Sequence, residues 1–139
     1  MTYTDNNRGS PQYPERMKQL IRFDGLRFEG NITPTDIDGF FEVHGETFVF
    51  FEVKLSGATL PKGQSLALTR LVDYLTQAGR DAALFICIHN VQDKGTEVMA
   101  HDLKVQSVYY KGKIIPWDGR TLKESVEAFV RASQRRRQL

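Results

Sequence analysis

The sequence predicts one α/β domain, and three features of its middle section carry that prediction. Two segments dense in Phe and Val, residues 39–43 and 47–54, flank a turn and give the strongest β signal in the chain. An amphipathic stretch at 64–77 follows, and an almost continuous apolar run at 82–88 comes soon after it. This order of strand, helix and strand predicts a crossover unit. A length of 139 residues suits a single hydrophobic core.

The beginning of the chain has weaker signals. Residues 1–13 are rich in Thr, Asn, Gly, Ser and Pro and have no apolar period, so we expect a flexible arm. A short helix is expected from Pro14, because apolar side chains follow it at helical spacing, and Asp24 with Gly25 would end it. Leu26 and Phe28 then indicate a brief strand before a bend.

The middle section contains a turn and a helical stripe. The turn between the two β segments is predicted at residues 44–46, where Gly45 is best able to take a positive φ. Residues 55–62 are expected to form a loop, and Gly79 is expected to end the helix that follows it. The predicted apolar stripe of that helix consists of Leu68, Leu71, Val72 and Leu75.

The last third of the chain predicts a second hairpin and a final helix. Residues 90–95 are a polar loop, and the segments 105–110 and 113–115 flank a Lys-Gly turn. Thr121 and Glu124 have the spacing of a capping box, which begins an amphipathic helix. We therefore expect a single domain over residues 14–131, followed by a basic tail at 132–139.

Composition narrows the class of protein. A hydrophobic fraction of 40% and a charged fraction of 26% are ordinary for globular domains and exclude wholesale disorder and fibrous repeats. The formal charge of +2 permits a polyanionic partner without requiring one. One cysteine, Cys87, allows no internal disulfide, and we expect it to be a small buried hydrophobe. Without a signal-peptide pattern or a membrane-length apolar run, we expect a soluble cytoplasmic protein with no membrane partner.

Charged side chains interrupt the second β segment near its end. Side chains alternate between the two faces of a strand, so Phe48, Phe50, Glu52 and Lys54 share one face. That face is apolar for most of its length and then presents a carboxylate and an ammonium group. Because burial of charges is costly unless they are paired or bind a metal, Glu52 and Lys54 are candidates for a functional site.

The predicted hairpin register places a second carboxylate beside the first. If Val43 faces Thr47, Asp38 faces Glu52 with Cβ atoms about 5 Å apart. Two carboxylates so placed repel each other, and a proton or a divalent cation relieves the repulsion. Oxygen ligands of this kind suit Mg²⁺ or Mn²⁺. The same register puts Asp36 opposite Lys54. Asp36 and Asp38 therefore lie on the same face of their strand, and either could be the metal ligand. We favour Asp38 because it faces Glu52.

Asp38 followed by Glu52, Val53 and Lys54 resembles the acidic residue and E-x-K signature of the PD-(D/E)XK phosphodiesterase superfamily. The resemblance extends over residues 15–90. It implies a restriction-endonuclease-like α/β/α core, in which helices flank a mixed β-sheet. It also implies a Mg²⁺ site, with Mn²⁺ as a substitute, formed by both acids and the Val53 carbonyl, and hydrolysis of DNA assisted by Lys54.

Two further residues match the superfamily less specifically. Glu15 resembles an acidic residue that many members carry on a first helix as a metal ligand, although a glutamate at a helix start also has an ordinary dipole explanation. Gln64 resembles a polar residue that some members place near the attacking water, and it also suits a helix start. The sequence departs from the compact signature because residues 35–37 separate Pro34 from Asp38.

The resemblance implies a metal-dependent DNA endonuclease, with a structure-selective enzyme such as a Holliday-junction resolvase as one form. Such resolvases generally act as homodimers, and a recruiting protein is another possible partner. Candidate nucleic-acid contacts are Lys111, Lys113, Arg135 and Arg136, whereas we expect Tyr109 or Tyr110 to pack inward. The alternative is a non-catalytic nucleic-acid-binding or protein-interaction module with the same fold. RNA cleavage and exonuclease activity also remain open.

Overall fold

The computed structural model describes residues 19–27, 29, 32–56 and 62–138. The chain divides into two units, Met1–Pro34 and Thr35–Leu139. The second unit contains a five-stranded sheet and two α-helices. Its elements are β1 (Gly39–Val43), β2 (Thr47–Leu55), α1 (Lys62–Gln77), β3 (Asp81–His89), the 3-10 turn η3 (Ala100–Asp102), β4 (Lys104–Tyr110), β5 (Lys113–Pro116) and α2 (Leu122–Arg137).

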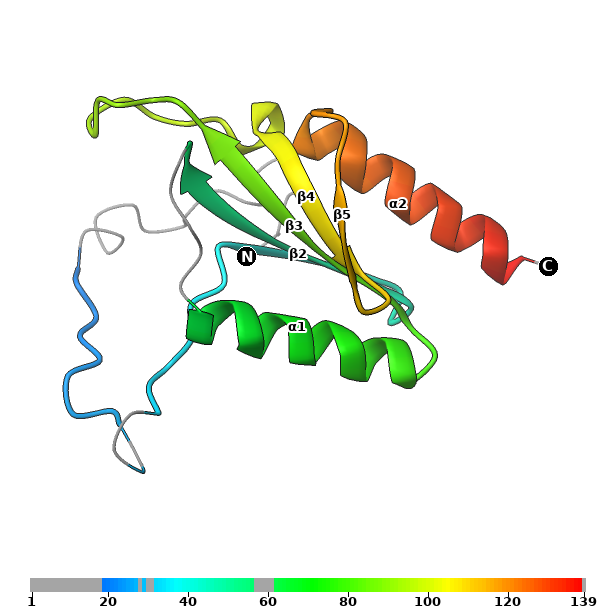
Figure 1. Ribbon diagram of the computed structural model, residues 1–139, viewed down its shortest axis with the longest axis horizontal. Coiled ribbons are helices and arrows are strands. Elements are labelled where there is room, and N and C mark those ends of the chain that lie inside the picture. The colour runs from blue at the N-terminus through cyan, green and yellow to red at the C-terminus, as the bar shows by residue number, and fades with distance from the viewer. Residues whose placement is uncertain (1–18, 28, 30–31, 57–61, 139) are drawn as a thin grey trace, which may run out of the picture. The chain divides into compact units, whose positions relative to one another are not determined.

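The sheet is mixed, and its strands lie in sequence order from β1 to β5. β2 and β3 are parallel and are connected through α1, which confirms the predicted crossover unit, whereas the other neighbouring strands are antiparallel. Helices α1 and α2 lie on opposite sides of the sheet (Figure 1). The expected α/β architecture with a mixed sheet between helices is therefore confirmed.

Two clusters of side chains form the core, one on each face of the sheet. On one face, Phe50 and Leu84 pack against Leu68 and Val72 of α1. The cluster on the other face includes Val49, Phe85, Cys87, Leu103, Val105 and Leu122, with Val126 and Phe129 of α2 packed against it. The strand β3 contributes to both clusters, which explains its continuous apolar sequence. Cys87 is fully buried, as predicted.

Local sequence signals account for the turns and the start of α2. His44 and Gly45 have φ values of 55° and 67° in the β1–β2 turn, which matches the predicted hairpin. The side chain of Thr121 accepts a hydrogen bond from the Glu124 N–H, and the Glu124 carboxylate accepts one from the Thr121 N–H. This is the predicted capping box, and it satisfies two amides that α2 leaves without helical partners.

Two predictions about helical packing are wrong. Residues 19–23 are not helical, and Leu20 and Ile21 are 82% and 77% exposed. A segment this short needs tertiary packing to be helical, and these side chains have little. Leu71 is 38% exposed because it lies at the edge of the stripe, roughly 60° around α1 from Leu68 and roughly 100° from Val72. Residues 1–18 and Phe28 lie outside the described residues.

The final helix is longer than predicted. Helix α2 continues to Arg137, so the residues expected to form a tail from 132 onward are helical as far as that arginine. Ser133, inside this stretch, is fully buried. The expected boundary at residue 132 therefore falls within an element that packs on the sheet. Among the described residues, no helix is long and apolar enough to cross a membrane.

Candidate active site

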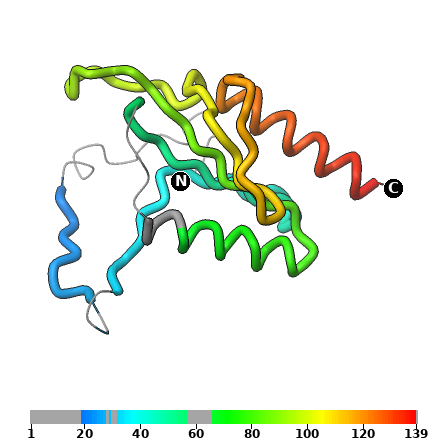
Figure 2. The backbone as a smooth tube through the Cα atoms, in the orientation of Figure 1, coloured from blue at the N-terminus to red at the C-terminus, as the bar shows by residue number. Residues whose placement is uncertain are grey.

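The parallel pair β2 and β3 gives the sheet two chemically different ends. The pair begins with Thr47 opposite Asp81, which we call the amino end, and finishes with Leu55 opposite His89, which we call the carboxyl end. The β1–β2 and β4–β5 turns lie toward the amino end, as the chain trace shows (Figure 2). Asp38 immediately precedes β1, so it lies toward the carboxyl end.

Asp38 and Glu52 face each other across the start of the hairpin. The ladder pairs Val43 with Thr47 and Gly39 with Phe51, which is the predicted register. One position further, the Asp38 N–H donates to Glu52 Oε1 at 3.4 Å. The Asp38 carboxylate in turn accepts a hydrogen bond of 2.7 Å from the Val53 N–H. These bonds hold both side chains against the backbone of the other strand.

Gly39 allows the two strands to approach closely next to this pair. A Cβ atom at Gly39 would overlap the ring of Phe51, the residue directly opposite. The Phe51 ring also packs against Phe41, with ring centroids 6.0 Å apart. Glycine is therefore required by the neighbouring ring, and this contact helps to fix where Asp38 begins the strand.

The environment of Glu52 strongly disfavours its charged form. The residue is 2% exposed. Burial, followed by the charge of Asp38, raises the pKa of Glu52 from 4.5 to about 7, and Asp36 adds a smaller effect in the same direction. The Asp38 N–H counteracts part of this rise. Near neutral pH, Glu52 is thus close to half-protonated, which is the predicted consequence of two facing carboxylates.

Lys54 follows Glu52 on the same face of β2. Phe48 and Phe50, which precede these two residues on the same face of the strand, belong to the cluster under α1. Lys54 is half-buried and pairs with Ile88 of β3. Helix α1 begins with Lys62 after the crossover connection. Gln64 lies in its first turn, but the side chain of Gln64 and all of Glu15 lie outside the described residues.

The position of Asp36 makes it a weaker candidate than Asp38 for the metal ligand. The strand ladder begins at Gly39, so the pairing of Asp36 with Lys54 is not part of the sheet. Asp36 has a smaller influence than Asp38 on the pKa of Glu52. The hydrogen bond from Val53 and the contact with Glu52 make Asp38 the better placed partner of the carboxylate on β2.

The donor atoms fit a hard divalent cation that also keeps water or phosphate ligands. Two carboxylates approach each other here, and the carbonyl of Val53 is the third predicted ligand. In the part of the chain that the structure describes, no group of three or more His, Cys, Asp or Glu side chains could hold a metal ion. Mg²⁺ commonly binds through one or two carboxylates together with waters and substrate phosphates. A cation at this place would offset the charge of Asp38, which adds to burial in raising the Glu52 pKa.

The predicted nucleic-acid contacts lie toward the other end of the sheet. Arg136 is 3.3 Å from the carboxylate of Asp81, and Lys111 lies over the Tyr110 ring at 5.3 Å from its centroid. Asp81 pairs with Thr47, five residues before Glu52, so roughly 17 Å of strand separates them. The structure therefore does not bring these arginine and lysine side chains to the acid pair. Whether they contact nucleic acid stays a prediction.

Both tyrosines pack inward, whereas only one of them was expected to do so. The Tyr109 hydroxyl donates to Asp73 of α1 at 2.8 Å, and its ring joins the cluster under that helix. The Tyr110 ring makes an edge contact with Phe129 of α2, with centroids 5.6 Å apart. Each tyrosine is thus part of one of the two cores, which leaves the lysines of this hairpin as its polar surface.

Sequence reasoning missed the side chains that gather where β3 ends. His89 and Asn90 line a pocket together with residues 97–99 and 102–104. The loop between these segments has no apolar period, so nothing in the sequence places its two halves side by side. The position of His89 at the end of a parallel strand was the one available signal, because ligand sites favour such strand ends.

Comparison of the chain with protein-family models, curated proteins and solved structures gave no match. The superfamily resemblance therefore depends on the residues and geometry described above.

Proposed function

We propose that this protein is a metal-dependent DNA endonuclease, and the facing pair of Asp38 and Glu52 is the observation that carries the proposal. A buried glutamate whose pKa is raised to about 7 by burial and by a neighbouring aspartate is unfavourable as structure alone. It is useful where a cation binds. Lys54, two residues further on the same face, adds the positive group that phosphodiester hydrolysis requires.

The proposed roles follow from the position of each side chain. Asp38, Glu52 and the Val53 carbonyl would hold Mg²⁺ or Mn²⁺, which supplies a Lewis acid for the phosphate and an acidified water. Lys54 would offset the negative charge that develops when water attacks phosphorus and one P–O bond breaks. Asp38 is exposed whereas Glu52 is buried, so a large substrate would approach from the side of Asp38.

Structure-selective cleavage, as in a Holliday-junction resolvase, is the form of this activity that we favour. The acid pair lies where β1 begins, and β1 is an edge strand of the sheet that the described residues form. An edge position leaves room for a bulky nucleic-acid substrate. Homodimer formation and recruitment by another protein are further proposals of the same kind.

A non-catalytic nucleic-acid-binding or protein-interaction module is the second candidate function. One observation favours it: among the described residues, no group of three or more acidic, His or Cys side chains could hold a metal ion. Such a module would bind its partner without a divalent cation, and neutralising Asp38 would leave binding unchanged. This expectation separates the two candidates directly.

The test is cleavage of labelled duplex, single-stranded and four-way-junction DNA, with matched RNA, in Mg²⁺ or Mn²⁺. We expect metal-dependent cutting by the wild type and its loss in Asp38→Asn and Lys54→Ala. Asp36→Asn and Lys123→Ala are matched controls that remove the same charges elsewhere and should keep most of the activity, because Lys123 is an exposed residue of α2. Thermal unfolding of every variant confirms that each is folded. A folded wild type that binds but cuts none of these substrates would refute the nuclease proposal.

A further inference from the structure

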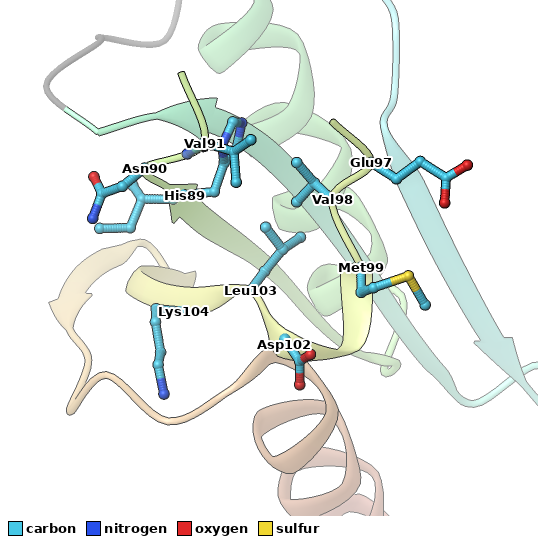
Figure 3. A pocket seen from close by; sticks show the side chains of 10 residues that line it. His89, Asn90, Val91, Glu97, Val98, Met99, Asp102, Leu103 and Lys104 are labelled. Carbon is cyan, nitrogen blue, oxygen red and sulfur yellow. Dashed lines mark hydrogen bonds between the residues drawn. The ribbon is translucent and has the colours of Figure 1, made fainter. Parts of the chain in front are cut away.

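A pocket lies at the carboxyl end of the sheet, between the end of β3 and the beginning of β4. Residues 88–91 form one wall and residues 97–99 form the other, with Leu103 between them (Figure 3). Its volume is about 340 Å³. This is near the lower limit for small-molecule sites, so the pocket suits one ring system better than an extended chain.

The pocket adjoins the acid pair through β2. Ile88, which lines it, pairs with Lys54, and the Ser56 N–H donates a hydrogen bond of 2.8 Å to the His89 carbonyl. Glu52 pairs with Ile86, two residues before Ile88. With strands about 4.8 Å apart and about 3.3 Å per residue, the Cα atoms of Glu52 and Ile88 are roughly 8 Å apart. The Glu52 side chain lies on the α1 face with Phe50, whereas Leu103 belongs to the cluster on the α2 face, so a strand whose phosphate is held at Glu52 would pass the end of the sheet to place a base in the pocket.

The centre of the pocket is apolar. Val98 and Leu103 point into the space between the walls, whereas Glu97 and Lys104 extend away from it (Figure 3). Val98 and Met99 are 38% and 56% exposed, so apolar surface is available to a ligand. The Met99 side chain extends away from this space, so Val98 and Leu103 supply its apolar surface (Figure 3). These walls favour a flat, uncharged ring over a phosphate or a sugar.

Hydrogen-bonding groups on the other wall suit a heteroaromatic ring. His89 Nδ1 accepts a hydrogen bond of 3.1 Å from the Val91 N–H, so the neutral imidazole carries its proton on Nε2. The amide of Asn90 extends outward from this wall, and it offers a donor and an acceptor together at the rim of the pocket, the pair that recognises an adenine edge (Figure 3). Asp102, which is 3.3 Å from His101 Nε2, adds a carboxylate to the lining and disfavours an anionic ligand.

We propose that this pocket receives one unpaired nucleobase of the strand being cut, an inference that rests on the proposed nuclease function. A base within a duplex is stacked and paired, so it must leave the helix before two chain segments can enclose it. Junctions, bulges and single strands present such bases at little cost. The pocket would thus select for substrate structure beside the acid pair, independently of any distant basic residue.

The test is a binding comparison in EDTA, where divalent cations are absent and cleavage is suppressed. Two labelled duplexes differ at one unpaired position, which carries adenine in one and an abasic sugar in the other. We expect the wild type to bind the adenine duplex about tenfold more tightly, the scale of one stacked base. Val98→Trp, which fills the pocket, should bind both duplexes equally. Gln92→Trp, a matched control in the same loop but outside the lining, should keep the preference.

Each outcome bears on a different claim. Equal affinity of the wild type for the two duplexes would overturn the base pocket, and this comparison needs no variant to fold. Binding of free adenosine without a preference between the duplexes would assign the pocket to free nucleosides and also overturn the proposal. A preference for the adenine duplex without any cleavage in Mg²⁺ would refute the nuclease and leave the base site standing. Cleavage in Mg²⁺ together with equal affinity for the two duplexes would support the nuclease and overturn the base site.

Discussion

The two ends of the sheet shift the pKa of a carboxylate in opposite directions, that of the partly buried Asp81 and that of the buried Glu52. At the amino end, burial acts to raise the pKa of Asp81, but the hydrogen bond from Ser133 and the charges of Arg136 and Arg137 outweigh it, so the pKa is lowered. At the carboxyl end, burial and Asp38 act together and raise the pKa of Glu52 to about 7. The first carboxylate stabilises the fold, whereas the second is held at the expense of stability.

The amino-end network is continuous through the core. Thr47 Oγ1 lies 2.6 Å from Ser133 Oγ, and Ser133 donates its hydroxyl hydrogen to Asp81, so Thr47 is the donor to Ser133. Arg137 donates to the carbonyls of Glu46 and Gly79 at 3.1 and 3.0 Å. The end of α2 is thereby tied to the β1–β2 turn and to the end of α1. At the acid pair, by contrast, the hydrogen bond from the Asp38 N–H offsets only part of the rise in the Glu52 pKa.

The largest expected effect is the loss of stability in Asp81→Asn. The change leaves Arg136 and Arg137 without their shared carboxylate and weakens the acceptor for Ser133. We expect the free energy of unfolding to fall by about 2–4 kcal/mol, measured by urea denaturation. Asp118→Asn is the control, because its ion pair with Arg120 is exposed and should cost under about 1 kcal/mol. Equal losses in the two variants would show that the amino end has no special role.

Glu52→Gln is expected to raise the free energy of unfolding at high pH, whereas Asp81→Asn lowers it. The folded-state pKa of about 7 exceeds the ordinary value of 4.5. The folded protein therefore binds this proton more tightly than the unfolded chain does, and the stabilisation is complete below about pH 4.5 and lost as the pH rises through 7. At pH 8 the variant should be more stable than the wild type by up to about 3 kcal/mol, with little difference at pH 4.5.

The measurement is urea denaturation of the wild type and Glu52→Gln across this pH range. Asp93→Asn is a control in which an exposed carboxylate is replaced by its amide, and it should not reproduce the gain at pH 8. A stability difference that stays constant with pH would mean that folding does not shift the pKa of Glu52. The contrast between the two ends of the sheet would then be lost.

Gly39→Ala tests the close approach beside the acid pair. Because its Cβ would meet the Phe51 ring, we expect a loss of about 1–3 kcal/mol and a larger loss of cleavage, since Asp38 is displaced. Gly95→Ala is the control, because the nearest atom to its Cβ is Asp93 Oδ1 at an ordinary 3.5 Å. Unfolding and cleavage assays on both variants decide the point. Full cleavage by a destabilised Gly39→Ala would show that the site does not depend on this contact.

The smallest expected effect is stabilisation by Mg²⁺. A cation must compete with the proton on Glu52. We therefore expect Mg²⁺, added at about 10 mM, to raise the melting temperature of the wild type more at pH 8 than at pH 5.5. The shift should be on the order of a few degrees. Asp38→Asn should show little of it, whereas Asp36→Asn should retain it. An equal shift at both pH values would argue against a site that includes Glu52.

The sequence predicted those features that depend on local chemistry. The turn at His44 and Gly45 fixed the hairpin register, and the register placed Asp38 beside Glu52. The partners of Arg137 were beyond such reasoning, because Glu46 and Gly79 are 91 and 58 residues away in the chain. The same applies to the pocket at His89, whose two walls are brought together by the return of the chain into β4.

The buried thiol of Cys87 allows opening of the core to be measured by its rate of alkylation. Burial, with a smaller effect from Asp38, raises the pKa of its thiol to about 12, so almost no thiolate forms at neutral pH. It is the one cysteine in the sequence and it pairs with Val53, the residue that holds Asp38. Its side chain lies in the cluster that α2 covers, so its rate of alkylation reports how often this part of the core opens. A ligand that binds at the acid pair would slow this reaction, and the labelling rate would then measure occupancy without any substrate being cut.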